Sequence, residues 1–367
     1  MDGIRIQRER LTAFCGEVFV RLKLPAADAR AAADVLVAAD ARGIPSHGVG
    51  RLWRYANGLR SGLMIPDAKP ETVTETPTSL VVNAHGAMGA PVSVRTMERV
   101  IAKAAVSGMA FAGVRDSNHF GIAGYYAMQA LPHDMIGIAM TNTAALGVPT
   151  FGRAAMFGTN PLAFAAPADR ERAFVLDMST TAVTRGKIEV CDREDKALPL
   201  GWAVDKTGRP ATDAKTILAD MQDRRGGGIL PLGGAGELLG GHKGYGLAVM
   251  VDILCAALSG APMGPEVFDT ATSSARVSHF FGAIQVASFR DPAAFRSDMD
   301  RMLGALRETP VGEGESRVYF AGQKEFEEED RCAREGVPLS VKTYESLRNI
   351  GRDIGVPPPE AREGERP

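Results

Sequence analysis

Two features that mark secreted and membrane proteins are missing from this 367-residue sequence. The first residues, Met1 to Leu11, have no apolar core of the signal-peptide type. No stretch approaches the about eighteen consecutive apolar residues that a membrane-spanning helix needs. We therefore expect a cytoplasmic protein with no membrane partner.

An excess of charge of either sign is also missing. The formal net charge is −2 and the pI is near 6.3, so nothing attracts a nucleic acid or an anionic surface over long range. Hydrophobic residues make up 45% and charged residues 23%, which is the balance of an ordinary globular chain. The expected partner is therefore a small molecule and not a nucleic acid.

Cysteine is scarce and widely spaced. No CxxC pair occurs, so the sequence predicts neither a disulfide framework nor a metal site, and we expect reduced thiols at Cys15, Cys191, Cys255 and Cys332. Two catalytic fingerprints are absent as well. No G-x-S-x-G elbow is present, and no G-x-G-x-x-G follows a strand and opens a helix, so a dinucleotide would have to bind without the Rossmann fingerprint.

Glycine, in contrast, is concentrated in the stretch LGGAGELLGGHKGYGLAVMVDILCAAL, residues 232 to 258. The apolar run from Leu247 to Leu258 is interrupted only by Asp252 and predicts a helix buried on every side. His242 and Lys243 precede it in the Gly-rich part, where free backbone N–H groups and a cation favour a phosphate. The alternative is that the glycines cap and pack the helix while Lys243 points to water.

A helical segment is expected to begin the chain, with Leu11, Phe14 and Val18 at helical spacing. After Pro45, Ser46 is a good N-cap, and a third helix starting there would align His47, Arg51 and Tyr55 on one face. That face would present a titratable group, an anion clamp and a hydroxyl. The alternative is a capped surface helix with a solvated Arg51 and a packed Tyr55.

Strands alternate with helices after a loop at 66–77, which indicates an α/β protein. His119 follows the strand expected at 109–114, where open α/β sheets place reactive groups, although it could equally cap or pack locally. Small polar residues gather at two further strand ends. They are Thr159 and Asn160 in a turn before a strand, and Ser179, Thr180 and Thr181 ahead of Lys187; the second group could bind a ribose or phosphate or serve as an N-cap cluster.

Several blocks occur in an order that resembles the malate/L-lactate dehydrogenase family. They are SHGVGR, SNHFGIAGYY, GTNPLAF, LDMSTTAVTRGKI, GWAVDKTGRPATD and GGHKGYGLAVMVDIL, and the resemblance covers roughly residues 5 to 350. The resemblance implies a non-Rossmann α/β fold with a mixed central sheet flanked by helices. It also implies a helical lobe from both chain ends (1–75, completed by 325–367), an α/β region at 76–324, and a homodimer.

The resemblance also implies residue roles. Proton transfer falls on His47 with Ser46 beside it, or in some members on His119, and carboxylate binding falls on Arg51. We place Tyr55, Thr159 and Asn160 with Arg51 as substrate contacts. The implied cofactor contacts are Thr143, Ser179, Thr180, Thr181, His242, Lys243, Gly322, Gln323 and Lys324, to which we add Lys187. The segment AGQKE departs from the usual P-G-E pattern of the family, and Lys187 stands where the family varies.

The expected function is therefore hydride transfer between NAD(P) and C2 of a small 2-hydroxy or 2-oxo acid, with malate or lactate as the default. The cofactor is expected to be NAD, with NADP left open. An imine reductase or a ureidoglycolate-type dehydrogenase on the same scaffold is the alternative. A nucleotide-binding protein without catalysis is the second alternative, and it has no need of a proton donor.

Overall fold

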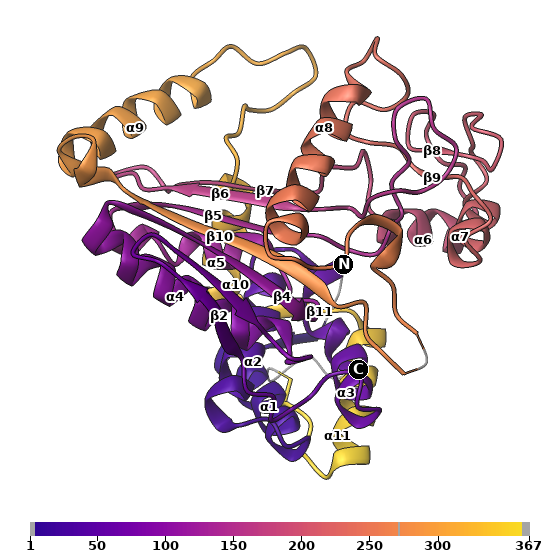
Figure 1. Cartoon of the computed structure of the whole chain (residues 1–367), viewed down its shortest axis with the longest axis horizontal. Coiled ribbons are helices and arrows are strands. Elements are labelled where there is room, and N and C mark those ends of the chain that lie inside the picture. The colour runs from indigo at the N-terminus through magenta and orange to yellow at the C-terminus, as the bar shows by residue number, and fades with distance from the viewer. Residues whose placement is uncertain (1–3, 271, 362–367) are drawn as a thin grey trace.

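A mixed seven-stranded sheet forms the centre of the computed structural model, which describes residues 4–270 and 272–361 (Figure 1). The strand order is β2-β3-β4-β10-β5-β6-β7. Only β3 and β4 pair in parallel; the other neighbours are antiparallel. The strands are β2 (Glu71–Glu75), β3 (Ser79–Asn83), β4 (Met109–Ser117), β5 (Met135–Thr141), β6 (Leu162–Ala166), β7 (Phe174–Met178) and β10 (Val277–Gln285). The predicted fold class is confirmed, but the segment 66–77 is not simply a loop, because it contains β2.

Helices cover both faces of this sheet. On one face, α4 (Gly89–Ser107) packs on β4 and β10, and α5 (Ala123–Met128) packs on β5, β6 and β7. On the other, α8 (Gly241–Asp252) continues into a π-helical turn (Ile253–Ala257) that packs on β4 and β10, and α9 (Pro292–Arg307) lies over the β6–β7 end (Figure 1). Adjacent residues of β10, Phe280 and Phe281, are therefore both buried, and a strand that alternation predicts to be half-exposed is closed on both sides.

Both chain ends build one helical lobe, as predicted. Strand β1 (Ile4–Ile6) pairs with β11 (Val337–Leu339), although their sequence positions are far apart. The lobe contains α1 (Arg8–Arg21), α2 (Ala26–Ala41), α3 (Leu52–Arg60), α10 (Gln323–Glu335) and α11 (Val341–Ile354). Leu11, Phe14 and Val18 of α1 are buried, so the helical spacing of the sequence identifies the face that packs on the other helices.

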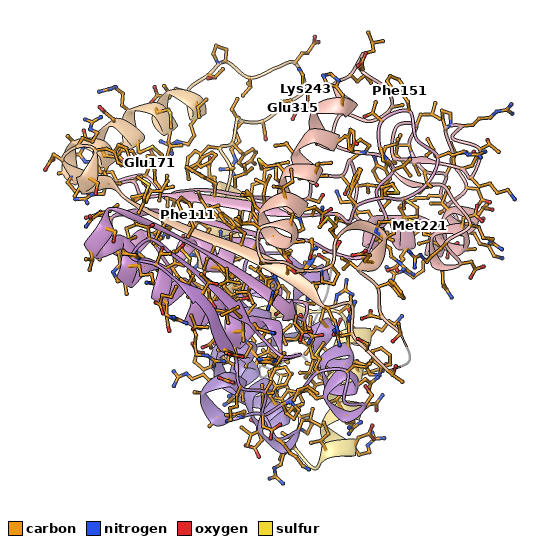
Figure 2. All side chains as sticks on the ribbon, viewed as in Figure 1. Phe111, Phe151, Glu171, Met221, Lys243 and Glu315 are labelled. Carbon is orange, nitrogen blue, oxygen red and sulfur yellow. The ribbon has the colours of Figure 1, made fainter. Side chains whose placement is uncertain are left out.

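The chain between β7 and α8 forms a small excursion with its own core, at the right of Figure 1. It holds α6 (Arg185–Arg193), α7 (Ala214–Gln222) and the short pair β8 (Ala203–Val204) and β9 (Gly228–Ile229). Val183, Ile188 and Ile217 are buried in this core, and Met221, labelled in Figure 2, lies at its edge.

The apolar helix at the end of the Gly-rich stretch is not buried on every side. Val249, Ile253 and Leu258 are 36%, 54% and 63% exposed, and they lie on one side of the helix. The prediction of a fully buried helix failed because an apolar residue need not be buried. A run of apolar residues therefore does not show which helix face packs on the sheet.

The described residues contain no helix with the length and apolarity to cross a bilayer. Within the same residues, no group of three His, Cys, Asp or Glu side chains is arranged to hold a metal ion. The four cysteines are free thiols, and burial raises the pKa of the Cys332 thiol to about 11.

Candidate active site

The chain from Pro45 to Arg60 does not form the single helix that the sequence predicts. It makes a 3₁₀ turn at Pro45–His47, an extended residue at Gly48, a second 3₁₀ turn at Val49–Arg51, and then α3. The buried carboxylate of Asp40 causes the break, because its Oδ2 accepts a hydrogen bond of 2.6 Å from the Val49 N–H. The predicted arrangement of His47, Arg51 and Tyr55 on one helix face is therefore wrong. The side chains of His47 and Tyr55 nevertheless both contact His119.

His47 instead lies against His119. The two imidazole rings are stacked with centroids 5.5 Å apart and planes 19° from parallel. Nδ1 of His47 is 2.9 Å from the Ser46 hydroxyl, so Nε2 is the ring nitrogen without a protein partner in this contact. His119 reaches this position from the segment between β4 and α5, at the carboxyl end of β4, as its sequence position predicts.

Tyr55 joins the pair from α3. Its hydroxyl is 2.6 Å from Nδ1 of His119, and the Gly121 N–H also points at this nitrogen from 3.3 Å. A backbone N–H can only donate, so Nδ1 of His119 is the unprotonated nitrogen, Tyr55 donates to it, and Nε2 carries the proton. Tyr55 thus fixes the tautomer of His119.

Two guanidinium groups flank the histidine pair. Nε of Arg51 donates to the Ser46 carbonyl at 2.7 Å, which leaves its two terminal nitrogens for an anion. Arg54, three residues further on, makes one ion pair with Asp269 at 3.4 Å and remains about half exposed. A helical spacing of three places two side chains next to each other, so the site has two neighbouring cations.

Burial and these cations make both imidazoles weak bases. Burial, followed by the charge of Arg51, lowers the pKa of His47 to about 4. Burial holds the pKa of His119 well below its usual range, with further contributions from His47, Arg54 and Arg51. Both rings are therefore neutral near pH 7. Nδ1 of His119 is engaged by Tyr55 and Gly121, so His47 is the ring with a nitrogen left to accept a proton.

His279 is a third histidine of this region, and sequence reasoning missed it. It is fully buried in β10, with Nδ1 at 2.8 Å from the Thr141 hydroxyl and Nε2 at 2.8 Å from the Ser117 hydroxyl. Burial lowers its pKa to about 3. His279 thus ties the ends of β4 and β5 together just before His119. A lone histidine in an apolar strand was the only signal in the sequence.

A second group of predicted residues gathers at the same edge of the sheet. The side chain of Asn160 accepts from the Thr143 N–H at 3.2 Å and donates to the Ala248 carbonyl at 2.9 Å and to Asp252 at 3.1 Å. The Thr143 hydroxyl accepts from the Thr159 N–H at 3.0 Å. The fully buried Asn160 amide therefore joins α8 to the β5–β6 connection.

The hydroxyls that follow β7 also bond to the backbone. Thr180 donates to the carbonyls of Thr159 or Asn160, Thr181 to that of Val183, and Ser179 to that of Thr181. Thr180 and Thr181 are buried, whereas Ser179 is half-buried. These contacts are those of a turn held by side chains, and Ser179 is the member of the run best placed to reach a ligand. Lys187 is exposed in the first turn of α6.

His242 and Lys243 lie apart from the histidine pair. Both are exposed in the first turn of α8, and Figure 2 shows Lys243 at the outer end of this helix, across the sheet from the helical lobe. Gly240 precedes the helix in a left-handed conformation and offers no side-chain cap. A Cβ at Gly241 would overlap the Gly234 carbonyl. The helix N-terminus is thus reached by a tight loop that only glycine permits.

Gly322, Gln323 and Lys324 begin α10 beside β7, close to the histidine pair. Gly322 and Lys324 line a pocket of about 310 Å³ together with Asp177, and its other walls include Ile44, three residues before His47, and Ile122, three residues after His119. Gly322 has φ 92°, and a Cβ there would crowd Val175. Oε1 of the buried Gln323 has no hydrogen-bond partner.

This pocket contains polar groups at which a ligand could bind. The start of α10 has no side-chain cap and leaves backbone N–H groups free beside the pocket. Oδ2 of Asp177 accepts from the Gly124 N–H at 2.7 Å, and burial raises the pKa of this carboxyl to about 6. The sequence analysis did not single out Asp177, although it lies in the block LDMSTTAVTRGKI. Only the fold shows that it lines this pocket.

Comparisons with known proteins agree with this architecture. The model of the malate/L-lactate dehydrogenase family matches residues 6–348. Malate dehydrogenase of Pyrococcus horikoshii is 39% identical over 96% of each chain, and malate/(S)-sulfolactate dehydrogenase of Methanothermus fervidus is 36% identical over 89% of this chain and 91% of that one. The crystal structure of malate dehydrogenase from Entamoeba histolytica superposes with a TM-score of 0.93 at 32% identity, covering 97% of this chain and 99% of that one.

The same scaffold serves other reactions among the relatives. Ureidoglycolate dehydrogenase of Escherichia coli is 30% identical over 94% of this chain, and the pyrroline- and piperideine-2-carboxylate reductase of Pseudomonas aeruginosa is 32% identical over 94%. The family model and the first relatives nevertheless cover nearly the whole sequence. The chain therefore belongs to the malate/L-lactate dehydrogenase family.

Proposed function

We propose that the protein is an NAD-dependent dehydrogenase that interconverts a small 2-hydroxy acid and its 2-oxo acid, with malate and oxaloacetate as the substrate pair. The observation that supports this best is the stacked pair of neutral histidines flanked by Arg51 and Arg54. Oxidation of a 2-hydroxy acid requires a base for the hydroxyl proton and a cation for the carboxylate.

His47 is the proposed base. With Nδ1–H donating to the Ser46 hydroxyl, the unprotonated Nε2 accepts the hydroxyl proton of the substrate as the C2–H bond breaks. The nicotinamide, when bound, takes up the hydride from C2. The electron pair of the O–H bond becomes the second C2–O bond, while the electron pair of the C2–H bond leaves with the hydride. The proton on His47 and the hydride on the cofactor together account for the two hydrogens lost by the substrate. In the reverse direction the imidazolium of His47 returns the proton to the oxygen.

Arg51 is the proposed clamp for the carboxylate next to C2. Its Nε is used by the Ser46 carbonyl, so the two terminal nitrogens make the parallel hydrogen bonds. Arg54 lies next to it and supplies a second cation, which fits the second carboxylate of malate better than the methyl group of lactate. Thr159 and Asn160 shape the neighbouring wall, and Tyr55 acts through His119.

The proposed cofactor is NAD. Gly322, Gln323 and Lys324 would hold it in the pocket beside His47, while His242 and Lys243 offer a second, separate anion site that the family resemblance assigns to the cofactor. The pocket also contains Asp177 and Glu325, and Lys324 lies 4.1 Å from the centre of the Tyr319 ring. The two carboxylates disfavour the additional phosphate of NADP, and Arg42 in the same pocket is already paired with Glu329 at 2.9 Å.

We also propose a homodimer in the cytoplasm, built from the helical lobe and α/β region at the predicted boundaries. The exposed apolar side of α8 supports the dimer, since Val249, Ile253 and Leu258 would otherwise meet water. Their spacing along one side of a helix suits burial against a second copy.

A substrate panel tests the function. Consumption of NADH or NADPH is followed with oxaloacetate, pyruvate, sulfopyruvate and a cyclic imine carboxylate, and reduction of NAD or NADP is followed with ureidoglycolate, which is already an alcohol. We expect the highest kcat/KM with oxaloacetate and NADH. Turnover of the imine alone would favour the reductase instead, and binding of NADH without turnover of any member would leave a nucleotide-binding protein.

A further inference from the structure

Asp40 is a buried carboxylate whose position sets the path of the active-site segment. It is the next-to-last residue of α2 and is only 5% exposed. Its Oδ2 accepts from the Val49 N–H at 2.6 Å. Across the described residues no arginine, lysine or histidine forms an ion pair with it. Burying a charge without a cation is costly, so the fold keeps this group against its own stability.

The same carboxyl packs on the residue that follows His47. Gly48 is extended, with φ −84° and ψ −158°, and a Cβ placed on it would overlap the Asp40 carboxyl. Asp40 therefore contacts both sides of the peptide between Gly48 and Val49. A side chain from α2 thus caps the turn at Val49–Arg51, which has no cap from its own N-cap residue.

This contact decides where His47 points. A continuous helix through residues 46–55 would place His47 and Tyr55 on one line along its face, about 12 Å apart by helical rise. The extended Gly48 breaks that line, and both side chains reach His119. The arrangement of the histidine pair is a consequence of the break at Gly48.

We propose that Asp40 is a positioning residue for proton transfer: its hydrogen bond to the Val49 N–H and its contact with Gly48 hold His47 stacked on His119. The proposal rests on the assignment of His47 as the proton-transfer residue. Burial raises the pKa of Asp40 to about 7, which is the behaviour of a carboxyl held in place by packing and one N–H. The facing thiol of Cys15 in α1 has its own pKa raised by burial and by Asp40, and it stays neutral.

A double-mutant cycle tests this directly. Asp40→Ala removes the contact, and Gly48→Ala pushes the new Cβ into the carboxyl. Each single change is expected to lower kcat by about ten- to a hundred-fold, because a misplacement of about 1 Å costs up to about a hundred-fold. The dissociation constant for NADH should stay within two-fold of the wild-type value. Since Asp40→Ala also makes room for the Cβ, the double variant should be no slower than Asp40→Ala alone.

Asp300→Ala is the matched control. Asp300 also uses a carboxylate to accept backbone N–H groups, from Asp169, Arg170 and Glu171, but it lies on α9 and holds the β6–β7 connection. The Asp300→Ala variant should be less stable than the wild type but should have the same kcat. If Asp40→Ala does not fold, Asp40→Asn replaces it: its amide oxygen still accepts from the Val49 N–H, so it should keep near wild-type kcat. Its side chain is as large as that of Asp40, so it should not relieve the loss caused by Gly48→Ala.

Two outcomes would overturn the proposal. The first is a kcat of the double variant that is reduced by the product of the two single losses. The second is an Asp40→Ala variant that loses as much stability as Asp300→Ala but keeps the wild-type kcat. Failure of the proposed function looks different, because the wild-type protein would then turn over none of the substrates in the first place.

Discussion

Tyr55→Phe removes one oxygen atom from the histidine pair and leaves the packing of the ring in place. The lost hydroxyl donates to Nδ1 of His119 at 2.6 Å, and the remaining donor is the Gly121 N–H at 3.3 Å. A typical hydrogen bond stabilises by about 0.5–1.5 kcal/mol, and a buried acceptor left unpaired costs about 1–3 kcal/mol. Because Gly121 still contacts Nδ1, we expect unfolding to become easier by about 1–2 kcal/mol.

The effect on catalysis is expected to exceed this structural cost. Without Tyr55 the proton of His119 is no longer confined to Nε2, and the ring on which His47 stacks can turn. We expect kcat to fall about ten-fold, equivalent to about 1.4 kcal/mol of barrier, with unchanged NADH affinity. Tyr344→Phe is the control, since this buried tyrosine donates to the Pro359 carbonyl at 3.3 Å in the helical lobe. Equal stability losses and wild-type kcat in both variants would refute the role of Tyr55.

Three further predictions follow from the site. Arg51→Lys keeps the charge but loses the fork and the bond to the Ser46 carbonyl, so kcat/KM for oxaloacetate should fall about ten- to a hundred-fold with unchanged NADH affinity, and a near wild-type value would remove Arg51 from the site. Lys243→Ala should raise the dissociation constant for NADH several-fold without altering circular dichroism; equal affinity would exclude this helix end. The pKa of His279 is lowered to about 3 in the folded protein and returns to about 6.5 in the unfolded chain. Between about pH 4 and pH 6, therefore, only the unfolded chain binds this proton. Stability should therefore rise with pH there, and His279→Gln should lower the slope by about 1.4 kcal/mol per pH unit in urea titrations; an unchanged slope would show that His279 is not buried in its neutral form.

Helical spacing was informative where one face of a helix packs on neighbours close in sequence. Leu11, Phe14 and Val18 identify the buried side of α1, and the paired chain ends follow from the family resemblance. The order of the strands could not be deduced in this way, because β10 enters between β4 and β5 from a distant part of the chain.

The predicted third helix failed for a tertiary reason. Ser46 is a good N-cap in local terms, but the Asp40 carboxylate and the glycine at position 48 terminate the first turn. His47 and Tyr55 nevertheless both contact His119, which the sequence also indicated as a candidate proton-transfer residue. His279 and Asp40 were missed because the burial of a single polar residue has no periodic signature in a sequence. Asp177 was missed because its bond to the Gly124 N–H joins residues that are far apart in the sequence.

The central claim is that His47 exchanges the substrate proton, and turnover of His47→Asn with oxaloacetate and NADH tests it most directly. Asparagine keeps a polar side chain of similar reach but cannot take up a proton. A positioned acid or base contributes about 10²–10⁴-fold, so kcat should fall by about two to four orders of magnitude. NADH should bind with unchanged affinity, and His119→Asn should cost less. Wild-type turnover in His47→Asn, or a larger loss in His119→Asn, would contradict the account.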